Sequence, residues 1–72
     1  MTDEQIEKLA GYIVYLRGRY DDYYAAGCED MVEYIGGKLE AAREIAIVFE
    51  CREEVFRKVE EMWGCDETSK PN

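Results

Sequence analysis

Histidine is absent from this sequence, which removes the side chain that most often acts as a general base or a metal ligand in proteins. Without it, no serine–histidine or cysteine–histidine pair can form, and the Glu-x-x-His motifs of di-metal helix bundles are excluded. No glycine-rich phosphate loop replaces them. We therefore expect a protein that is not an enzyme and that has no catalytic residue, no metal site and no cofactor.

Cysteine pairs and long apolar runs are missing as well. Cys28, Cys51 and Cys65 are odd in number and have no short spacing, so they predict reduced thiols rather than a disulfide framework. The longest apolar run, residues 45–49, is five residues long, whereas a membrane helix needs ~20. Residues 1–7 are acidic and lack the apolar segment of a signal peptide. These features predict a cytoplasmic protein that does not span a membrane.

Basic residues are few. Nine lysines and arginines oppose seventeen aspartates and glutamates, which gives a net charge of −8. Phosphates are bound by clusters of Lys and Arg, so direct binding to nucleic acid is not expected. An acidic chain of this kind either prefers a basic partner or uses its charge to stay soluble. At 72 residues it forms one domain with a small core, which oligomerisation commonly supplements.

What the sequence does contain is helical periodicity. Thr2 and Gln5 have the spacing of a capping box, which predicts that a helix begins there. Gly27 is a typical residue for the end of this helix, where the left-handed conformation is common. The apolar residues between them are spaced three and four apart, as in helices packed side by side: Ile6, Leu9, Ile13, Leu16, Tyr20 and Tyr23.

A second pattern with the same rhythm covers residues 28–64. Gly36 and Gly37 interrupt it, but the apolar face keeps its phase on both sides, which favours one long helix bent at the glycines. The alternative is a break into two helices at this point. Residues 65–72 are polar and are interpreted as a flexible C-terminal tail, so that the domain comprises residues 1–64. The predicted fold class is all-α, an antiparallel helical hairpin with a long second helix.

The two predicted helices differ in length. At 1.5 Å per residue the first spans ~36 Å and the second ~53 Å, so the first leaves the end of the second without a partner in the chain. Burying a large apolar side chain is worth about 1.5–3 kcal/mol, so a stripe of them is rarely left in water. We expect a homodimer with a four-helix core. The residues expected to mediate self-association are Val55, Phe56, Val59, Met62 and Trp63.

All six tyrosines lie within residues 12–34. On the helical wheel Tyr20 belongs to the core, whereas Tyr15 points away from it beside Val14. Three further rings lie on the flanks of the apolar face: Tyr12, Tyr23 and Tyr24. Core packing or a protein interface is favoured over stacking of nucleic-acid bases, because few Lys or Arg residues lie near the rings.

Two functions fit these features. In the first, the chain is an interaction or regulatory module that binds another protein through apolar, salt-resistant helix docking. In the second, it is an acidic mimic that occupies the nucleic-acid groove of a basic protein and is released by salt. Phage-encoded inhibitors of that kind are similar to this chain in size and charge only. The first is preferred, because pairs such as Glu53–Arg57 and Glu54–Lys58 are expected to neutralise much of the acid locally. The candidate partner-binding residues are Val14, Tyr15, Tyr23, Asp21, Asp22, Glu29, Asp30 and Glu33.

Overall fold

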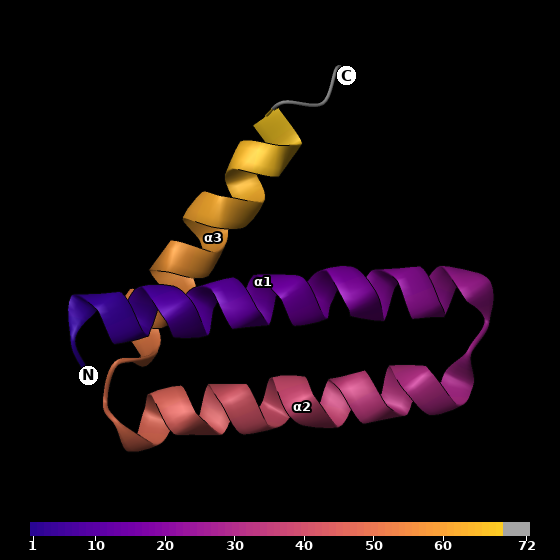
Figure 1. The fold of residues 1–72 in the computed structure, drawn as a ribbon, viewed down its shortest axis with the longest axis horizontal. Helices are drawn as coiled ribbons and strands as arrows, with labels where there is room; N and C mark the ends of the chain where they lie inside the picture. The colour runs from indigo at the N-terminus through magenta and orange to yellow at the C-terminus, as the bar shows by residue number, and fades with distance from the viewer. Residues whose placement is uncertain (69–72) are drawn as a thin grey trace.

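Three helices make up the part of the chain that the structure, a computed structural model, describes: residues 1–68, with side chains up to residue 63. They are α1 (Asp3–Ala26), α2 (Glu29–Val48) and α3 (Arg52–Thr68) (Figure 1). The all-α class is confirmed, but the long second helix is wrong. α1 is the longest element at 24 residues, and the segment expected to form one helix forms α2 with 20 residues and α3 with 17.

α1 is the central element of the fold. α1 and α2 lie side by side and run in opposite directions, whereas α3 packs across the first half of α1 and makes few contacts with α2 (Figure 1). α3 continues to Thr68, past the expected end at Gly64, and residues 69–72 of the expected tail lie outside the described residues. None of the three described helices combines the length and the hydropathy that a membrane crossing requires.

Both ends of α1 form as the sequence predicts. The Thr2 hydroxyl accepts a hydrogen bond from the Gln5 amide at 3.1 Å, and the Gln5 side chain accepts one from the Thr2 amide at 2.9 Å. At the other end Gly27 has a φ of 75°, and its amide donates to the Tyr24 carbonyl while the Cys28 amide donates to the Tyr23 carbonyl. This pair of bonds is a Schellman motif, in which glycine takes the left-handed position at no steric cost.

α2 ends with the same motif but without a glycine. The amide of Glu50 donates to the Ile47 carbonyl and that of Cys51 donates to the Ala46 carbonyl, and Glu50 has a φ of 55°. The left-handed conformation costs a residue with a side chain about 1–2 kcal/mol. Signals for helix ends rest mainly on glycine and proline, so nothing in the sequence marks this break.

The alternative break at Gly36 and Gly37 is also wrong, because α2 passes through both glycines without interruption. Gly36 lies beside Tyr20, whose Cε2 would be in ordinary van der Waals contact, at 3.8 Å, with a Cβ added to Gly36. Tyr20 is half-buried and stacks on Tyr24 with 6.4 Å between the ring centroids. Tyr20 therefore packs between α1 and α2 near the turn that joins them.

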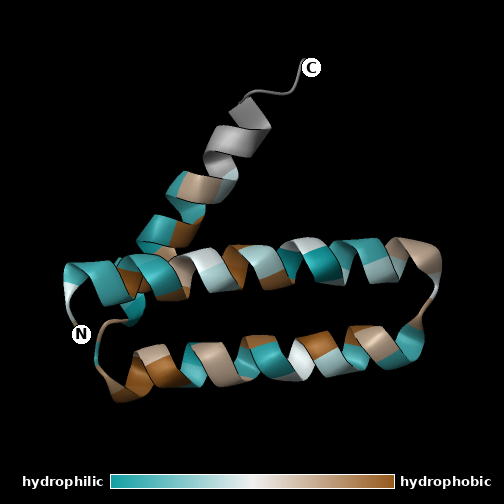
Figure 2. Ribbon diagram, in the orientation of Figure 1, coloured by the Kyte–Doolittle hydropathy of each residue, from teal (hydrophilic) through white to brown (hydrophobic). Residues whose placement is uncertain are grey.

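The main core lies where the three helices meet. Its buried members are Ile6, Ala10, Ile13, Ala42, Ala46, Cys51, Val55 and Val59. Ala10 and Ala46 have no exposed surface, and their small side chains leave room for the helices to approach one another closely. Figure 2 shows the hydrophobic residues of α2 gathering towards its end, beside the start of α3.

The expectation that the apolar stripe of α3 has no partner within the chain is wrong. Val55 and Val59 are fully buried in the shared core, and Phe56, Met62 and Trp63 are half-buried. Burying two valines is worth about 3–6 kcal/mol. That gain exceeds the penalty of about 1–2 kcal/mol for the left-handed residue at the break. Self-association through these five residues stays a prediction. The argument for it, that these residues have no partner within the chain, no longer holds.

Candidate functional site

Three exposed tyrosine rings share one side of the α1–α2 pair. Tyr12 and Tyr15 come from α1 and Tyr34 from α2, and 45%, 60% and 56% of their respective surfaces are exposed. Lys38 lies among them, with its Nζ 4.7 Å from the centroid of the Tyr34 ring. We call Tyr12, Tyr15, Tyr34 and Lys38 the tyrosine face.

Electrostatic interactions connect the members of the tyrosine face. A hydrogen bond to Tyr34 raises the pKa of Lys38, and the nearby phenol groups of Tyr34, Tyr12 and Tyr15 raise it further. The ammonium therefore stays charged and is attracted by the Tyr34 ring. Helical spacing explains the grouping, because Tyr12 and Tyr15 are three residues apart on α1 and Tyr34 and Lys38 are four apart on α2.

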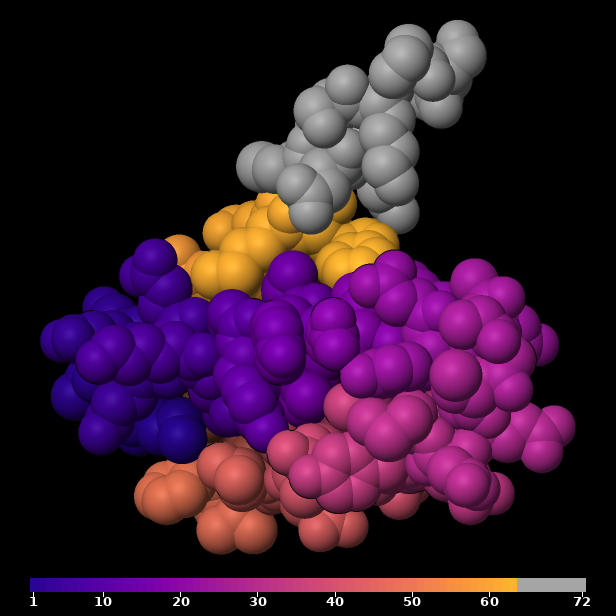
Figure 3. All heavy atoms as spheres, turned by 45° about the vertical axis from the view of Figure 1, so that its right-hand side comes forward, coloured from indigo at the N-terminus to yellow at the C-terminus, as the bar shows by residue number. Residues whose placement is uncertain are grey.

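α3 covers the other side of α1. The guanidinium carbon of Arg17 lies 4.7 Å from the centroid of the Trp63 ring, so Arg17 faces α3. Tyr15 precedes Arg17 by two residues, which places it about 160° further around the helix at ~100° per residue. The tyrosine face is therefore free of α3. Figure 3 shows the side chains of α1 and α2 as one continuous surface, with α3 above and partly behind it.

A second cation borders the tyrosine face. Nη2 of Arg19 donates to the Tyr23 hydroxyl at 2.8 Å, and its guanidinium carbon lies 5.1 Å from the centroid of the same ring. The hydrogen bond to Tyr23 raises the pKa of Arg19, and the nearby Tyr15 acts in the same direction. Arg19 thus connects the half-buried Tyr23 with the exposed Tyr15.

Exposed apolar side chains also gather at the corner between α2 and α3. We call Ile45, Ile47, Val48 and Phe49 the corner patch; their surfaces are 43% to 75% exposed. Ile45 follows Lys38 by seven residues, about two helical turns, so Ile45 lies on the side of α2 that carries the tyrosine face. Ile47 lies about 160° around the helix from Ile45, so the corner patch wraps around the end of α2. Exposed large apolar side chains of this kind mark interaction surfaces in small proteins.

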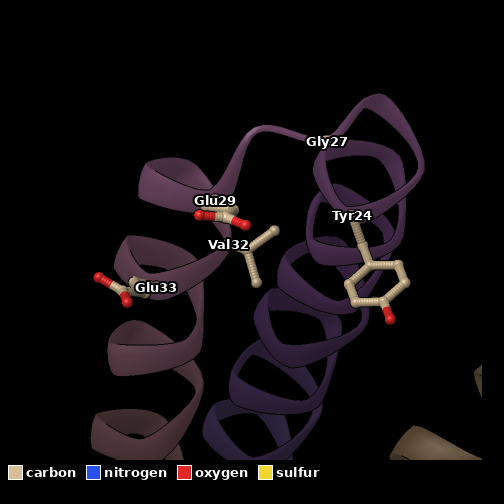
Figure 4. Close-up of a pocket in the computed structure, with 5 residues that line it drawn as sticks. All are labelled: Tyr24, Gly27, Glu29, Val32 and Glu33. Atoms are coloured by element: carbon tan, nitrogen blue, oxygen red, sulfur yellow. The ribbon is translucent and has the colours of Figure 1, made fainter.

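The acidic residues predicted to bind a partner lie at the other end of the α1–α2 pair, around the turn. All five are exposed: Asp21, Asp22, Glu29, Asp30 and Glu33. An open hollow there is lined by Tyr24, Gly27, Glu29, Val32 and Glu33. Val32 points into the space between the helices, and Glu33 points away from it (Figure 4). This open, acidic rim is suited to contact with a basic surface.

Two neighbouring residues predicted to bind a partner have different surroundings. Tyr15 belongs to the tyrosine face, whereas Val14 is half-buried and packs against the core. Successive residues of a helix point ~100° apart, so one can face the packed side of α1 while the next faces water. Val14 is therefore a packing residue in this structure.

Sequence reasoning missed three of the four members of the tyrosine face. Tyr34 and Lys38 were not among the predicted partner-binding residues, although their spacing of four places them on one side of a helix. The helical wheel places Tyr12 on a flank of the apolar face of the first helix, and 45% of its surface is exposed. The same-side spacing on each helix was a usable signal, but which sides of α1 and α2 meet depends on how the helices pack.

Charge neutralisation on α3 differs from the prediction. Neither Glu53–Arg57 nor Glu54–Lys58 forms an ion pair, and within the described part of α3 Lys58 pairs with Glu61 instead, at 3.8 Å. That pair is solvent-exposed, so it contributes little to stability. Less of the acidic charge is therefore neutralised locally than the sequence suggested.

Among the described residues, the cysteine and carboxylate side chains are the candidate metal ligands, and the cysteines are the candidate disulfide partners. Within residues 1–68, no group of three or more His, Cys, Asp or Glu side chains is arranged to hold a metal ion. The buried thiol of Cys51 donates to the Met1 sulfur at 3.5 Å, and Cys28 is exposed at the turn; neither forms a disulfide. The expectation that the chain is not an enzyme stays a prediction.

No protein-family model, curated protein or solved structure matches this chain. What the chain does must therefore be inferred from its own surfaces. Three of them stand out: the tyrosine face, the corner patch and the acidic turn between α1 and α2.

Proposed function

We propose that this chain is a small protein-binding module whose partner docks on the tyrosine face through aromatic and apolar contacts. The observation that supports this most directly is the exposure of Tyr12, Tyr15 and Tyr34 around Lys38, on the side of α1 that α3 leaves free. Tyrosine is enriched at protein interfaces because its rigid ring offers a large contact area while its hydroxyl bonds to water or to the partner.

The chemistry of the tyrosine face defines what a partner must supply. Apolar side chains would cover the rings, and burying each large one is worth about 1.5–3 kcal/mol. Lys38 and Arg19 would meet acceptor oxygens, either carboxylates or the free carbonyls at the end of a helix. An amphipathic helix with such an acceptor at the rim of its apolar stripe satisfies both requirements.

The test is a pull-down from the native host, eluted in steps of increasing salt. One variant replaces Tyr12, Tyr15 and Tyr34 by Ser; the control, Tyr24→Ser, removes a ring that is 72% exposed but lies outside the face. We expect a partner that the wild type and the control retain at high salt and that the triple variant loses. Circular dichroism verifies that all three chains are folded. If the triple variant retains the same partner, the proposal is wrong.

A second candidate function, mimicry of nucleic acid, is favoured by the charge around the turn. Residues 20–37 contain five acids and no lysine or arginine. The ion pairs within the described residues, Glu4–Lys8 and Lys58–Glu61, involve none of these acids. Such a surface would attract a basic protein, and the attraction between exposed charges is screened beyond ~10 Å at 0.1 M salt.

The two functions predict different elution. A mimic would release its partner at moderate salt, duplex DNA or RNA would compete for that partner, and replacing the five turn acids by Asn or Gln would abolish binding. The triple tyrosine variant would bind such a partner normally. We prefer docking on the tyrosine face, because solubility alone accounts for the exposed acids, whereas exposed rings grouped around a cation are unfavourable to leave uncovered.

A further inference from the structure

The connection between α2 and α3, residues Phe49 to Cys51, is the strained point of the fold. Glu50 has a φ of 55°, in the region that favours glycine, although Glu50 and Cys51 make the same two backbone hydrogen bonds that Gly27 and Cys28 make after α1. The strain is released if residues 49–51 take up a right-handed or extended conformation. In that case α3 moves away from the core of its own chain.

α3 packs mainly on α1 and much less on α2. Val55 and Val59 are buried in the core beside Ile6 and Ala10, and α3 makes few contacts with α2. α3 can therefore leave without separating α1 from α2. The vacated site on α1 is complementary to α3 itself, so the α3 of a second copy fills it with the same contacts.

The corner patch indicates that the second copy is the occupant. Its four exposed apolar residues directly precede or begin the strained connection. When two chains exchange an identical element, their connecting segments cross from one copy to the other. The corner-patch residues next to these segments then lie beside the second copy, which can cover part of the apolar surface that the monomer leaves in water.

We propose that two copies of this chain form a dimer by exchanging α3, with Phe49–Cys51 as the hinge. In the exchanged dimer Val55, Val59 and Trp63 of one copy occupy the site on α1 of the other. The corner patch of each copy lies beside the other copy, and Glu50 leaves the left-handed region. The exchange does not use the tyrosine face, so it is independent of the proposed partner binding.

The decisive variant is Glu50→Gly, with Glu50→Ala as its matched control. Glycine removes the strain of the monomer, whereas alanine keeps it. We expect sedimentation equilibrium at 1–200 μM to show a dimer for the wild type and a similar dissociation constant for Glu50→Ala. Each relieved hinge should weaken dimerisation about tenfold, so the dissociation constant of Glu50→Gly should rise about 100-fold. A wild type that stays monomeric, or a dimer that Glu50→Gly does not weaken, overturns the proposal.

Photo-crosslinking identifies the exchange itself. Arg17 lies against Trp63 and is replaced by benzoylphenylalanine in a tagged chain, which is mixed with an untagged chain and refolded. Exchange predicts crosslinks that join the tagged chain to the peptide around Trp63 of the untagged chain. The same crosslinks are expected to become intramolecular when both chains carry Glu50→Gly. Intramolecular crosslinks alone in the wild-type background would show that any dimer forms without exchange.

Discussion

The same substitution, valine to alanine, is expected to change the free energy of unfolding very differently at two sites of this protein. Val59 has no exposed surface and belongs to the core shared by the three helices, whereas Val48 is 75% exposed in the corner patch. Removing the buried methyl groups of Val59 loses about 1.6 kcal/mol of transfer free energy, at ~0.8 kcal/mol each. The cavity left behind adds about 1 kcal/mol. We expect Val59→Ala to lower the free energy of unfolding by about 2–3 kcal/mol.

Val48→Ala is the matched control. Only about a quarter of the side chain is buried, so the lost transfer free energy is about 0.4 kcal/mol. Alanine is the better helix former by a similar amount, since ordinary residues differ by up to ~0.7 kcal/mol. The net change in the free energy of unfolding should therefore stay within ~0.5 kcal/mol. In a domain of this size the melting temperature should fall roughly 8–24 °C for Val59→Ala and less than ~4 °C for Val48→Ala.

Urea unfolding measures both effects. Far-ultraviolet circular dichroism follows the three helices, and the fluorescence of Trp63, the sole tryptophan, follows the docking of α3 on α1. All chains are compared at one low protein concentration, so that any dimer contributes equally. Equal destabilisation by the two substitutions, or a loss below ~0.5 kcal/mol for Val59→Ala, would refute the packing of α3 in the core.

Three further predictions concern two glycines, a helix cap and one aromatic contact, each measured by thermal or urea unfolding. Gly27→Ala should destabilise by about 1 kcal/mol because φ is 75° there, whereas Gly37→Ala, inside α2, should stabilise by about 0.5–1 kcal/mol because no atom beyond its own stretch of helix lies within 4 Å of the added Cβ. Thr2→Ala removes the capping box and should cost about 0.5–2 kcal/mol, with a matching loss of helical signal. Arg17→Ala should cost about 0.5–1 kcal/mol and change the fluorescence of Trp63; an unchanged spectrum would contradict the contact.

The ends of α1 were predictable because local chemistry decides them. Thr2 and Gln5 satisfy each other's backbone amides, and Gly27 supplies a left-handed conformation that few other residues adopt. Neither feature depends on what the rest of the chain does. The all-helical class follows from apolar spacing in the same local way.

The end of α2 was not predictable from local chemistry. Glu50 is an ordinary helix former, and the apolar pattern keeps its phase across it. The break exists because it lets Val55 and Val59 reach α1, a gain that outweighs the strain at Glu50 and that appears only once three helices are packed. Long-range burial here overrides local propensity.

The sequence predicts the two pairs of residues that make up the tyrosine face, but it does not predict that the pairs lie together. The spacing of Tyr12 and Tyr15 places them on one side of α1, and that of Tyr34 and Lys38 places them on one side of α2. Which sides adjoin depends on the rotation of each helix about its axis, and packing at the core sets that rotation. The spacing in the sequence therefore predicts each pair, whereas the contact between the two pairs depends on how the helices pack.

The position of α3 decides which surface of the molecule is free for a partner. An uncovered stripe on α3 would have made Val55 and Val59 the contact surface, but both are buried beside α1. α3 occupies one side of α1, and Tyr15 of the tyrosine face, about 160° around from Arg17, lies on the side that α3 does not reach. A partner and α3 can then bind α1 at the same time. Val59→Ala should therefore lower stability while partner binding persists below the melting temperature, and the triple tyrosine variant should abolish binding although the chain remains folded.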